Sequence, residues 1–200
     1  MQLARISFPI LLLFVVSNTV ADEVTEQIQA GLRAYEQGDY QTAVTELNFA
    51  VAEIQKRIDE ARKKVLPDPL PGWTAEAPRA QSMAMMGMGG NQLGRLYRRE
   101  GGQEQVEIEI FVDSPMVQMF AMMMTNPMML QADPSTRLYR HGGRRGVLSH
   151  DAGADEWQLS FVLGNGRILL QLTGSGLKDE KPLLAYLDAL DLDKVEALAR

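Results

Sequence analysis

The 200-residue chain has no cysteine and only two histidines. Without cysteine, disulfides, thiolate metal sites and thiol catalysis are excluded. Nucleophilic catalysis usually needs a histidine base, and neither His141 nor His150 has a serine or threonine in a recognisable nucleophile turn. Paired acids such as Glu107 and Glu109 fall on the outside of a predicted strand, where carboxylates are usually solvated. We therefore predict a protein without enzymatic activity.

Aromatic side chains are also scarce, at 6% of the chain, and no basic stripe is interleaved with them. Because such a stripe is the usual signature of nucleic-acid binding, we predict no nucleic-acid partner for a chain of formal net charge −6. Some arginines still form a local basic patch, which either steers an acidic partner or lipid headgroup or forms cross-strand ion pairs. These arginines are Arg95, Arg98, Arg99, Arg137, Arg140, Arg144 and Arg145.

Long apolar runs are absent except at the chain start, where Arg5 precedes the run 6–16 and Thr19-Val20-Ala21 follows it. A positive residue, a short apolar run and small residues are typical of a secretory signal peptide. We predict a signal peptide over 1–21, cleavage after Ala21 and a bacterial periplasmic location, with an uncleaved membrane anchor as the alternative. The run is shorter than the ~20 residues of a membrane-spanning helix, so we expect no transmembrane segment after signal removal.

Apolar residues recur at helical spacing over 23–65, with a break at Gly38-Asp39-Tyr40, so this stretch is predicted to be a helical hairpin. Eight of its residues resemble one tetratricopeptide repeat, namely Gly31, Tyr35, Gly38, Asp39, Tyr40, Ala43, Leu47 and Ala50. The resemblance implies peptide or protein binding. A lone repeat cannot bury its own apolar face, which must be covered by the second domain, by a second copy of the chain or by another protein. The hairpin residues that we expect to contact a protein partner are Tyr35, Tyr40, Leu47 and Ile54.

A proline-rich stretch at 67–72 is predicted to be an extended linker between the hairpin, 22–66, and a second domain, 73–200. Trp73 follows directly and is expected to anchor that domain by burying its ring.

Alternating apolar residues and turn signals predict six strands in the second domain, at 91–100, 105–112, 136–141, 144–150, 156–163 and 167–173. Helices are predicted at 115–125, 182–190 and 192–198. This β-β-α-β-β-β-β-α order predicts an α+β fold, with an antiparallel sheet of about six strands and helices packed on one face. The order resembles Mog1/PsbP-like α/β domains. The motifs Pro71-Gly72-Trp73 and Asp113-Ser114-Pro115 and the closing acidic-leucine helix at Leu187–Leu192 also resemble those of uncharacterised bacterial periplasmic proteins. These resemblances imply an accessory or binding module.

Methionine is the most unusual feature of the composition, with seven of twelve methionines in 114–130 and four in 83–88. Met116, Met119, Phe120 and Met123 are predicted to share one helix face. Methionines either fill a core or an adaptable apolar groove, or bind a soft ion such as Cu(I) through their thioethers. In a groove, Met119 and Met123 would contact the partner. In a copper site, the ligands would be Met83, Met85, Met86 and Met88.

These observations predict a non-enzymatic periplasmic binding or accessory protein that acts through protein–protein interaction and needs no cofactor. A homo-oligomer is also compatible with an uncovered hairpin face. The alternative is a Met-rich periplasmic protein that binds Cu(I) and handles copper.

Overall fold

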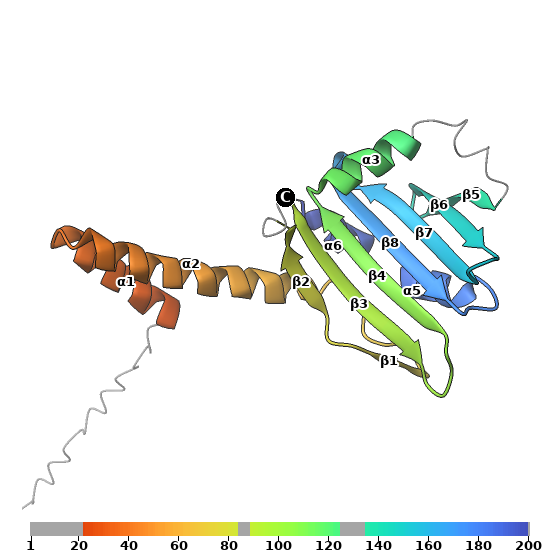
Figure 1. The fold of residues 1–200 in the computed structure, drawn as a ribbon, viewed down its shortest axis with the longest axis horizontal. Helices are drawn as coiled ribbons and strands as arrows, with labels where there is room; N and C mark the ends of the chain where they lie inside the picture. The colour runs from red at the N-terminus through yellow and green to blue at the C-terminus, as the bar shows by residue number, and fades with distance from the viewer. Residues whose placement is uncertain (1–21, 84–88, 125–134, 200) are drawn as a thin grey trace, which may run out of the picture. The chain divides into compact units, whose positions relative to one another are not determined.

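A computed structural model describes residues 22–83, 89–124 and 135–199, which form two compact units that divide between Gln55 and Lys56 (Figure 1). The first unit contains helix α1, Glu23–Glu36, and most of helix α2, Tyr40–Lys63. The predicted helical hairpin is therefore confirmed. The proline-rich stretch 67–72 belongs to the second unit.

The turn between α1 and α2 follows from two residues. Gly38 has a φ of +80°, a conformation that suits glycine because it has no Cβ atom. Asp39 follows, and its Oδ1 accepts a hydrogen bond from the backbone N–H of Thr42 at 3.1 Å. This bond satisfies one of the free N–H groups at the start of α2. Hydrogen bonding to the side chain of Thr42, and then to its backbone N–H, lowers the pKa of the Asp39 carboxyl.

The second unit is built on an antiparallel sheet of eight strands, so the predicted α+β fold is confirmed. In the sheet the strands lie in the order β1-β3-β4-β8-β7-β6-β5, and β2 pairs with β3. The strands are β1 (Trp73–Ala75), β2 (Arg79–Ser82), β3 (Asn91–Arg99), β4 (Gln105–Val112), β5 (Thr136–His141), β6 (Arg144–Asp151), β7 (Glu156–Leu163) and β8 (Ile168–Ser175). The six predicted strands are present, and β1 and β2 add two short ones.

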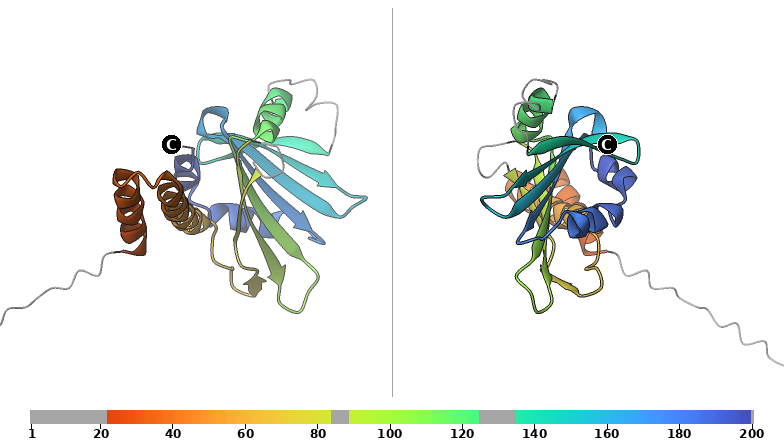
Figure 2. Two further views of the ribbon diagram at one scale, coloured as in Figure 1. Left: turned by 60° about the vertical axis from the view of Figure 1, so that its left-hand side comes forward. Right: turned by 90° about the vertical axis from the view of Figure 1, so that its right-hand side faces the viewer.

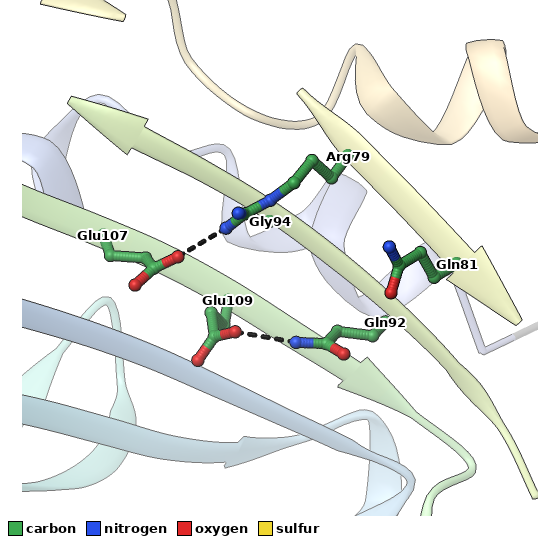
Figure 3. A pocket seen from close by; sticks show the side chains of 6 residues that line it. All are labelled: Arg79, Gln81, Gln92, Gly94, Glu107 and Glu109. Atoms are coloured by element: carbon green, nitrogen blue, oxygen red, sulfur yellow. Dashed lines mark hydrogen bonds and ion pairs between the residues drawn. The ribbon is translucent and has the colours of Figure 1, made fainter. Parts of the chain in front are cut away.

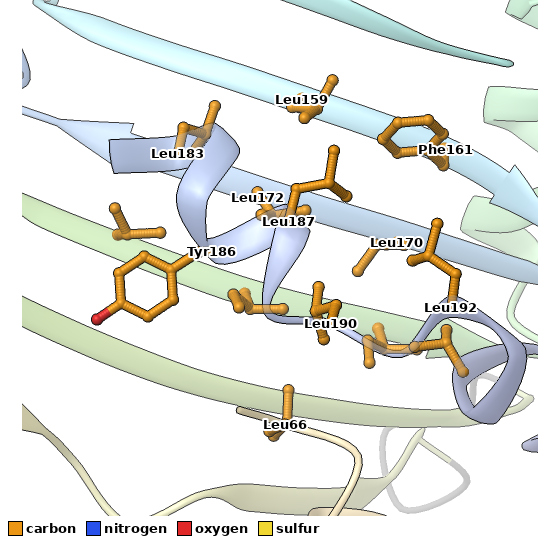
Figure 4. Packing of buried hydrophobic residues seen from close by; sticks show 14 of the residues in the cluster. Leu66, Leu159, Phe161, Leu170, Leu172, Leu183, Tyr186, Leu187, Leu190 and Leu192 are labelled. Atoms are coloured by element: carbon orange, nitrogen blue, oxygen red, sulfur yellow. The ribbon is translucent and has the colours of Figure 1, made fainter. Parts of the chain in front are cut away.

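One face of the sheet carries the main core because alternate residues of the central strands are apolar. On β4, Val106, Ile108 and Ile110 are completely buried. Helices α5 (Lys181–Asp188) and α6 (Leu192–Ala197) cover this face. Figure 4 shows leucines of these helices and of the segment between them facing the leucines of β7 and β8.

Helix α3, Pro115–Met124, lies on the opposite face of the sheet, so the prediction that the helices share one face is wrong for this helix (Figure 2). Its buried residue is Val117, which packs on Phe111 and Leu169, and these two side chains alternate with those of the main core. The helix begins as predicted, because the Oγ atom of Ser114 accepts a hydrogen bond from the N–H of Met116 at 3.3 Å.

The side of α3 that packs on the sheet differs from the predicted one. Met116 and Phe120 pack beside Val117, whereas Met119 is 67% exposed. Because Val117 contacts the sheet, the residue two positions after it is turned by about 200° around the helix axis, toward solvent. Met119 therefore does not share an inward face with Met116 and Phe120.

The proline-rich stretch is held on the second unit by hydrogen bonds and apolar contacts. The carbonyl oxygen of Pro67 accepts hydrogen bonds from Tyr97 Oη at 2.7 Å and Arg95 Nη1 at 2.8 Å. Trp73 is buried as predicted, and its ring lies edge-on to that of Tyr186 at 5.5 Å between centroids. The segment is thus a fixed part of the second unit.

Candidate functional site

The two helices of the hairpin approach closely because small residues line their contact. Ala43 and Ala50 on α2 are 2% and 1% exposed, and Gly31 on α1 is also buried. A Cβ atom added at Gly31 would lie 2.8 Å from Cγ of Leu47, so a larger residue would displace that side chain. Small residues allow the helices to pair, but they bury little apolar surface. Most large apolar side chains of the hairpin are exposed, and Leu47 lies at the edge of this contact, 41% exposed.

Five large side chains recur along α2 at alternating spacings of four and three residues, and we call them the apolar stripe. They are all exposed, from 40% for Ile54 to 63% for Val51, and they comprise Tyr40, Val44, Leu47, Val51 and Ile54. Side chains at these spacings share one face of a helix, which is the pattern of a helix–helix contact. A contiguous exposed apolar surface of this kind typically marks an interaction site.

The stripe contains three of the residues expected to contact a partner, Tyr40, Leu47 and Ile54. The fourth, Tyr35 on α1, is exposed too, and its ring lies 5.5 Å from that of Tyr40 between centroids. Val44 and Val51 were missed, although they continue the same spacing. Met119 and Met123 lie on α3 in the second unit, and contact of any of these residues with a partner stays a prediction.

The segment 22–55, which carries the stripe, is strongly acidic, whereas the last turns of α2 are basic. Between Asp22 and Gln55 the only basic residue is Arg33. The acidic residues of this segment are Asp22, Glu23, Glu26, Glu36, Asp39, Glu46 and Glu53. The negative charge of the whole chain is therefore concentrated around this apolar surface.

The proposed copper ligands are only in part within the described residues. Met83 is 5% exposed, and its backbone N–H donates a hydrogen bond to the carbonyl oxygen of Gly90 at 3.0 Å. Met85, Met86 and Met88 lie outside the described residues. Within the described part of the chain, no three or more histidine, aspartate or glutamate side chains gather as they would around a metal ion.

A polar cavity of about 280 Å³ lies on the second unit, on the face of the sheet opposite the main core, over β2, β3 and β4 (Figure 3). Two hydrogen bonds join side chains that line the cavity. Arg79 Nη2 donates to Glu107 Oε1 at 2.5 Å, and Gln92 Nε2 donates to Glu109 Oε1 at 2.7 Å. The lining residues are Arg79, Gln81, Gln92, Gly94, Glu107 and Glu109.

Glu109 differs from the solvated acid that the sequence predicted. It lies in the middle of β4, between β3 and β8, and its side chain is half-buried. Burial raises the pKa of the Glu109 carboxyl, and the negative charge of Glu107 raises it further. The hydrogen bond from Gln92 and the charge of Arg79 oppose this shift.

Most arginines of the predicted basic patch are neutralised by carboxylates. Arg137 binds both oxygens of Glu180 at 2.6 Å, and Arg144 binds Asp193 and Glu196. Arg98 pairs with Glu76, and Arg99 lies 3.6 Å from Glu104. The ion-pair interpretation thus fits these arginines. Arg140 and Arg145 face each other across β5 and β6.

Comparison of the chain with protein-family models, with curated proteins and with solved structures finds no match. The resemblances to a tetratricopeptide repeat and to Mog1/PsbP-like domains therefore stay predictions. No helix within residues 22–83, 89–124 and 135–199 is long and apolar enough to cross a membrane.

Proposed function

We propose that the protein is a non-enzymatic periplasmic binding or accessory protein that engages a protein partner through its helical hairpin. The observation that supports this function is the apolar stripe, a row of exposed large side chains on a helix whose small residues already pack against α1. The periplasmic location rests on the signal-like sequence of residues 1–21.

The spacing and charge of the hairpin define the chemistry of the partner. Apolar residues that alternate at spacings of three and four fit the apolar face of another helix. The acidic surroundings favour a partner with lysine and arginine on its polar face, because complementary charges speed encounter and disfavour wrong partners. The partner is thus an amphipathic helix with net positive charge. A second copy of the chain is disfavoured because its segment 22–55 carries the same acidic charge.

The test uses two synthetic amphipathic helices, each about three heptads long, with leucine and isoleucine at the apolar positions. One carries lysine on its polar face and the other carries glutamate. We expect the purified protein to bind the lysine peptide in a fluorescence anisotropy titration and to bind the glutamate peptide at least about tenfold more weakly. Equal binding of both peptides would refute the charge argument, and binding of neither would refute the proposed function.

A matched pair of variants tests the stripe itself. In Val51→Gln/Ile54→Gln, two stripe residues lose most of the apolar surface that a partner would bury. Fully burying one such side chain contributes about 1.5–3 kcal/mol, and Val51 and Ile54 are each only about half exposed, so the two together can lose about 1.5–3 kcal/mol. We therefore expect the affinity for the lysine peptide to fall about 10- to 100-fold. Ala52→Gln changes an exposed residue of α2 outside the stripe and should leave the affinity within about twofold. Circular dichroism should show the same helix content in all three proteins.

Sedimentation velocity of the same proteins decides between a foreign helix and a second copy. If the wild type forms a dimer that Val51→Gln/Ile54→Gln dissolves, the stripe is the interface of a homodimer and the proposed partner is wrong. A wild-type monomer that binds the lysine peptide in a one-to-one complex supports the proposal.

A further inference from the structure

The floor of the polar cavity contains a glycine in the middle of a strand. Gly94 lies on β3, opposite Glu109 of β4 on one side and Arg79 of β2 on the other. Glycine in a strand interior destabilises a protein by about 0.5–1 kcal/mol relative to alanine. Such a glycine usually marks a positive φ angle, a β-bulge or the close approach of a backbone or ligand.

Neither the φ angle nor the strand pairing requires a glycine at position 94. It is not among the glycines with positive φ. The pairing of β3 with β4 is continuous from Asn91 to Arg98, so there is no bulge. A Cβ atom added at Gly94 would lie 3.6 Å from both Arg79 Nη2 and the carbonyl oxygen of Ile108, which are ordinary van der Waals distances. The glycine therefore leaves a space over the strand that the guanidinium of Arg79 partly fills, with Nη2 at 3.6 Å and Nε at 3.9 Å from the position of that Cβ atom.

Polar side chains surround this space on several sides. In Figure 3, Arg79, Gln81 and Gln92 stand on β2 and β3, while Glu107 and Glu109 rise from β4. At about 280 Å³, the cavity is near the lower end of the range for small-molecule sites, about 300 Å³. It is therefore of a size for a small molecule of a few heavy atoms.

Unused hydrogen-bonding capacity in the cavity indicates what that molecule carries. A carboxylate has about four acceptor positions. Among the described residues, the side chain of Glu109 accepts a hydrogen bond only from Gln92, whereas Glu107 is held by the guanidinium of Arg79. With one arginine and two glutamates, the lining has an excess of one negative charge. The site thus favours a ligand that donates hydrogen bonds and carries positive charge.

We propose that this cavity binds a small organic cation with an ammonium or guanidinium group. The carboxylate of Glu109 is its counter-ion, and the cavity beside that carboxylate provides the room for it. The amide of Gln81, at the rim, supplies a further hydrogen-bonding group. This site lies on the second unit and is independent of the hairpin and its partner.

The test compares three probes of the same length and different charge. These are 1,4-diaminobutane, 1,4-butanediol and succinate, titrated into the full-length protein by isothermal calorimetry at neutral pH. We expect heat from the diamine and none from the diol or the dianion. Equal binding of all three, or no binding of the diamine, would overturn the proposal.

Three variants locate the binding to the cavity. Glu109→Gln should weaken the affinity for the diamine by about tenfold or more, because hydrogen bonds to charged groups are about twice as strong as neutral ones. Glu100→Gln removes the same charge at an exposed residue of the β3–β4 turn and should leave the affinity within about twofold. Gly94→Ala narrows the cavity beside the guanidinium of Arg79 and should weaken binding while the thermal unfolding midpoint stays at or above that of the wild type. If Glu109→Gln and Glu100→Gln weaken binding equally, the effect is one of net charge and the proposed site is wrong.

Discussion

We predict opposite changes in stability when each of two strand glycines of the second unit is changed to alanine. Gly94 lies over the polar cavity, where an added Cβ atom meets its nearest neighbours at 3.6 Å. Gly146 lies in β6 on the main core, where an added Cβ atom would be 2.7 Å from both a ring carbon of Phe161 and the carbonyl oxygen of Ser160. Neither residue has a positive φ. The two variants therefore differ mainly in the room that the structure leaves for the added Cβ atom.

The geometry sets the expected changes in the free energy of unfolding. Gly94→Ala should stabilise the protein by about 0.5–1 kcal/mol, because alanine restricts the unfolded chain and fits the native backbone. Gly146→Ala should destabilise it by about 1–3 kcal/mol, the usual range for overpacking a core. The backbone oxygen of Ser160 cannot rotate away as a flexible side chain would, so the strands themselves must shift.

Urea unfolding followed by tryptophan fluorescence measures both effects. Trp73 and Trp157 belong to the second unit, so the signal reports the unit in which both glycines lie. With a slope of about 1–3 kcal/mol per M urea, a change of 1 kcal/mol moves the midpoint by roughly 0.3–1 M. If Gly94→Ala lowered the free energy of unfolding by 1 kcal/mol or more, the strand would need this glycine for structural reasons. The ligand interpretation of the cavity would then lose one of its supports.

Two further predictions concern polar groups of the same unit. Because burial raises the pKa of the Glu109 carboxyl, the folded chain holds this proton more tightly than the unfolded chain. The free energy of unfolding should therefore fall as pH rises through the folded-state pKa of Glu109. Glu109→Gln should accordingly raise the urea midpoint at about pH 7 relative to wild type and lose this advantage at about pH 4, close to the ordinary pKa of glutamate. An equal difference at both pH values would contradict the assignment. Tyr97→Phe removes one of the two donors to the Pro67 carbonyl, and Arg95 still donates to it. Its cost should therefore be only about 0.5–1.5 kcal/mol in the same assay, and a loss above about 3 kcal/mol would show that Arg95 does not satisfy this carbonyl.

Sequence patterns located most of the fold because they report local geometry. Alternation of apolar and polar residues identified β4, and Ser114-Pro115 identified the start of α3. The short strands β1 and β2 were missed. They have three and four residues, and β2 has no alternating apolar pattern of its own. Both form because β3 offers backbone hydrogen-bonding groups to them, which is a tertiary effect.

The two candidate sites differ in how far the sequence reveals them. The apolar stripe is visible in the spacing from Tyr40 to Ile54, because a single helix places those residues on one face. The cavity is not visible, because Arg79, Gly94 and Glu109 come from three strands and meet only through the pairing register. A shift of one residue in that register would turn Glu109 into the core. No local pattern carries this information.

The cavity is lined by residues of paired strands, and this affects how a ligand would bind in it. Glu107 and Glu109 stand on β4, which is paired on both sides along its whole length, and Gln92 and Gly94 stand on β3, also paired on both sides. Positions of these residues are therefore set by the sheet and its buried core, not by a loop. A ligand that enters such a site does not have to order the backbone around it, so little binding free energy is lost to ordering. The proposed specificity for a cation then rests on the charge and hydrogen-bonding capacity of Glu109, and a single substitution at that residue should change it.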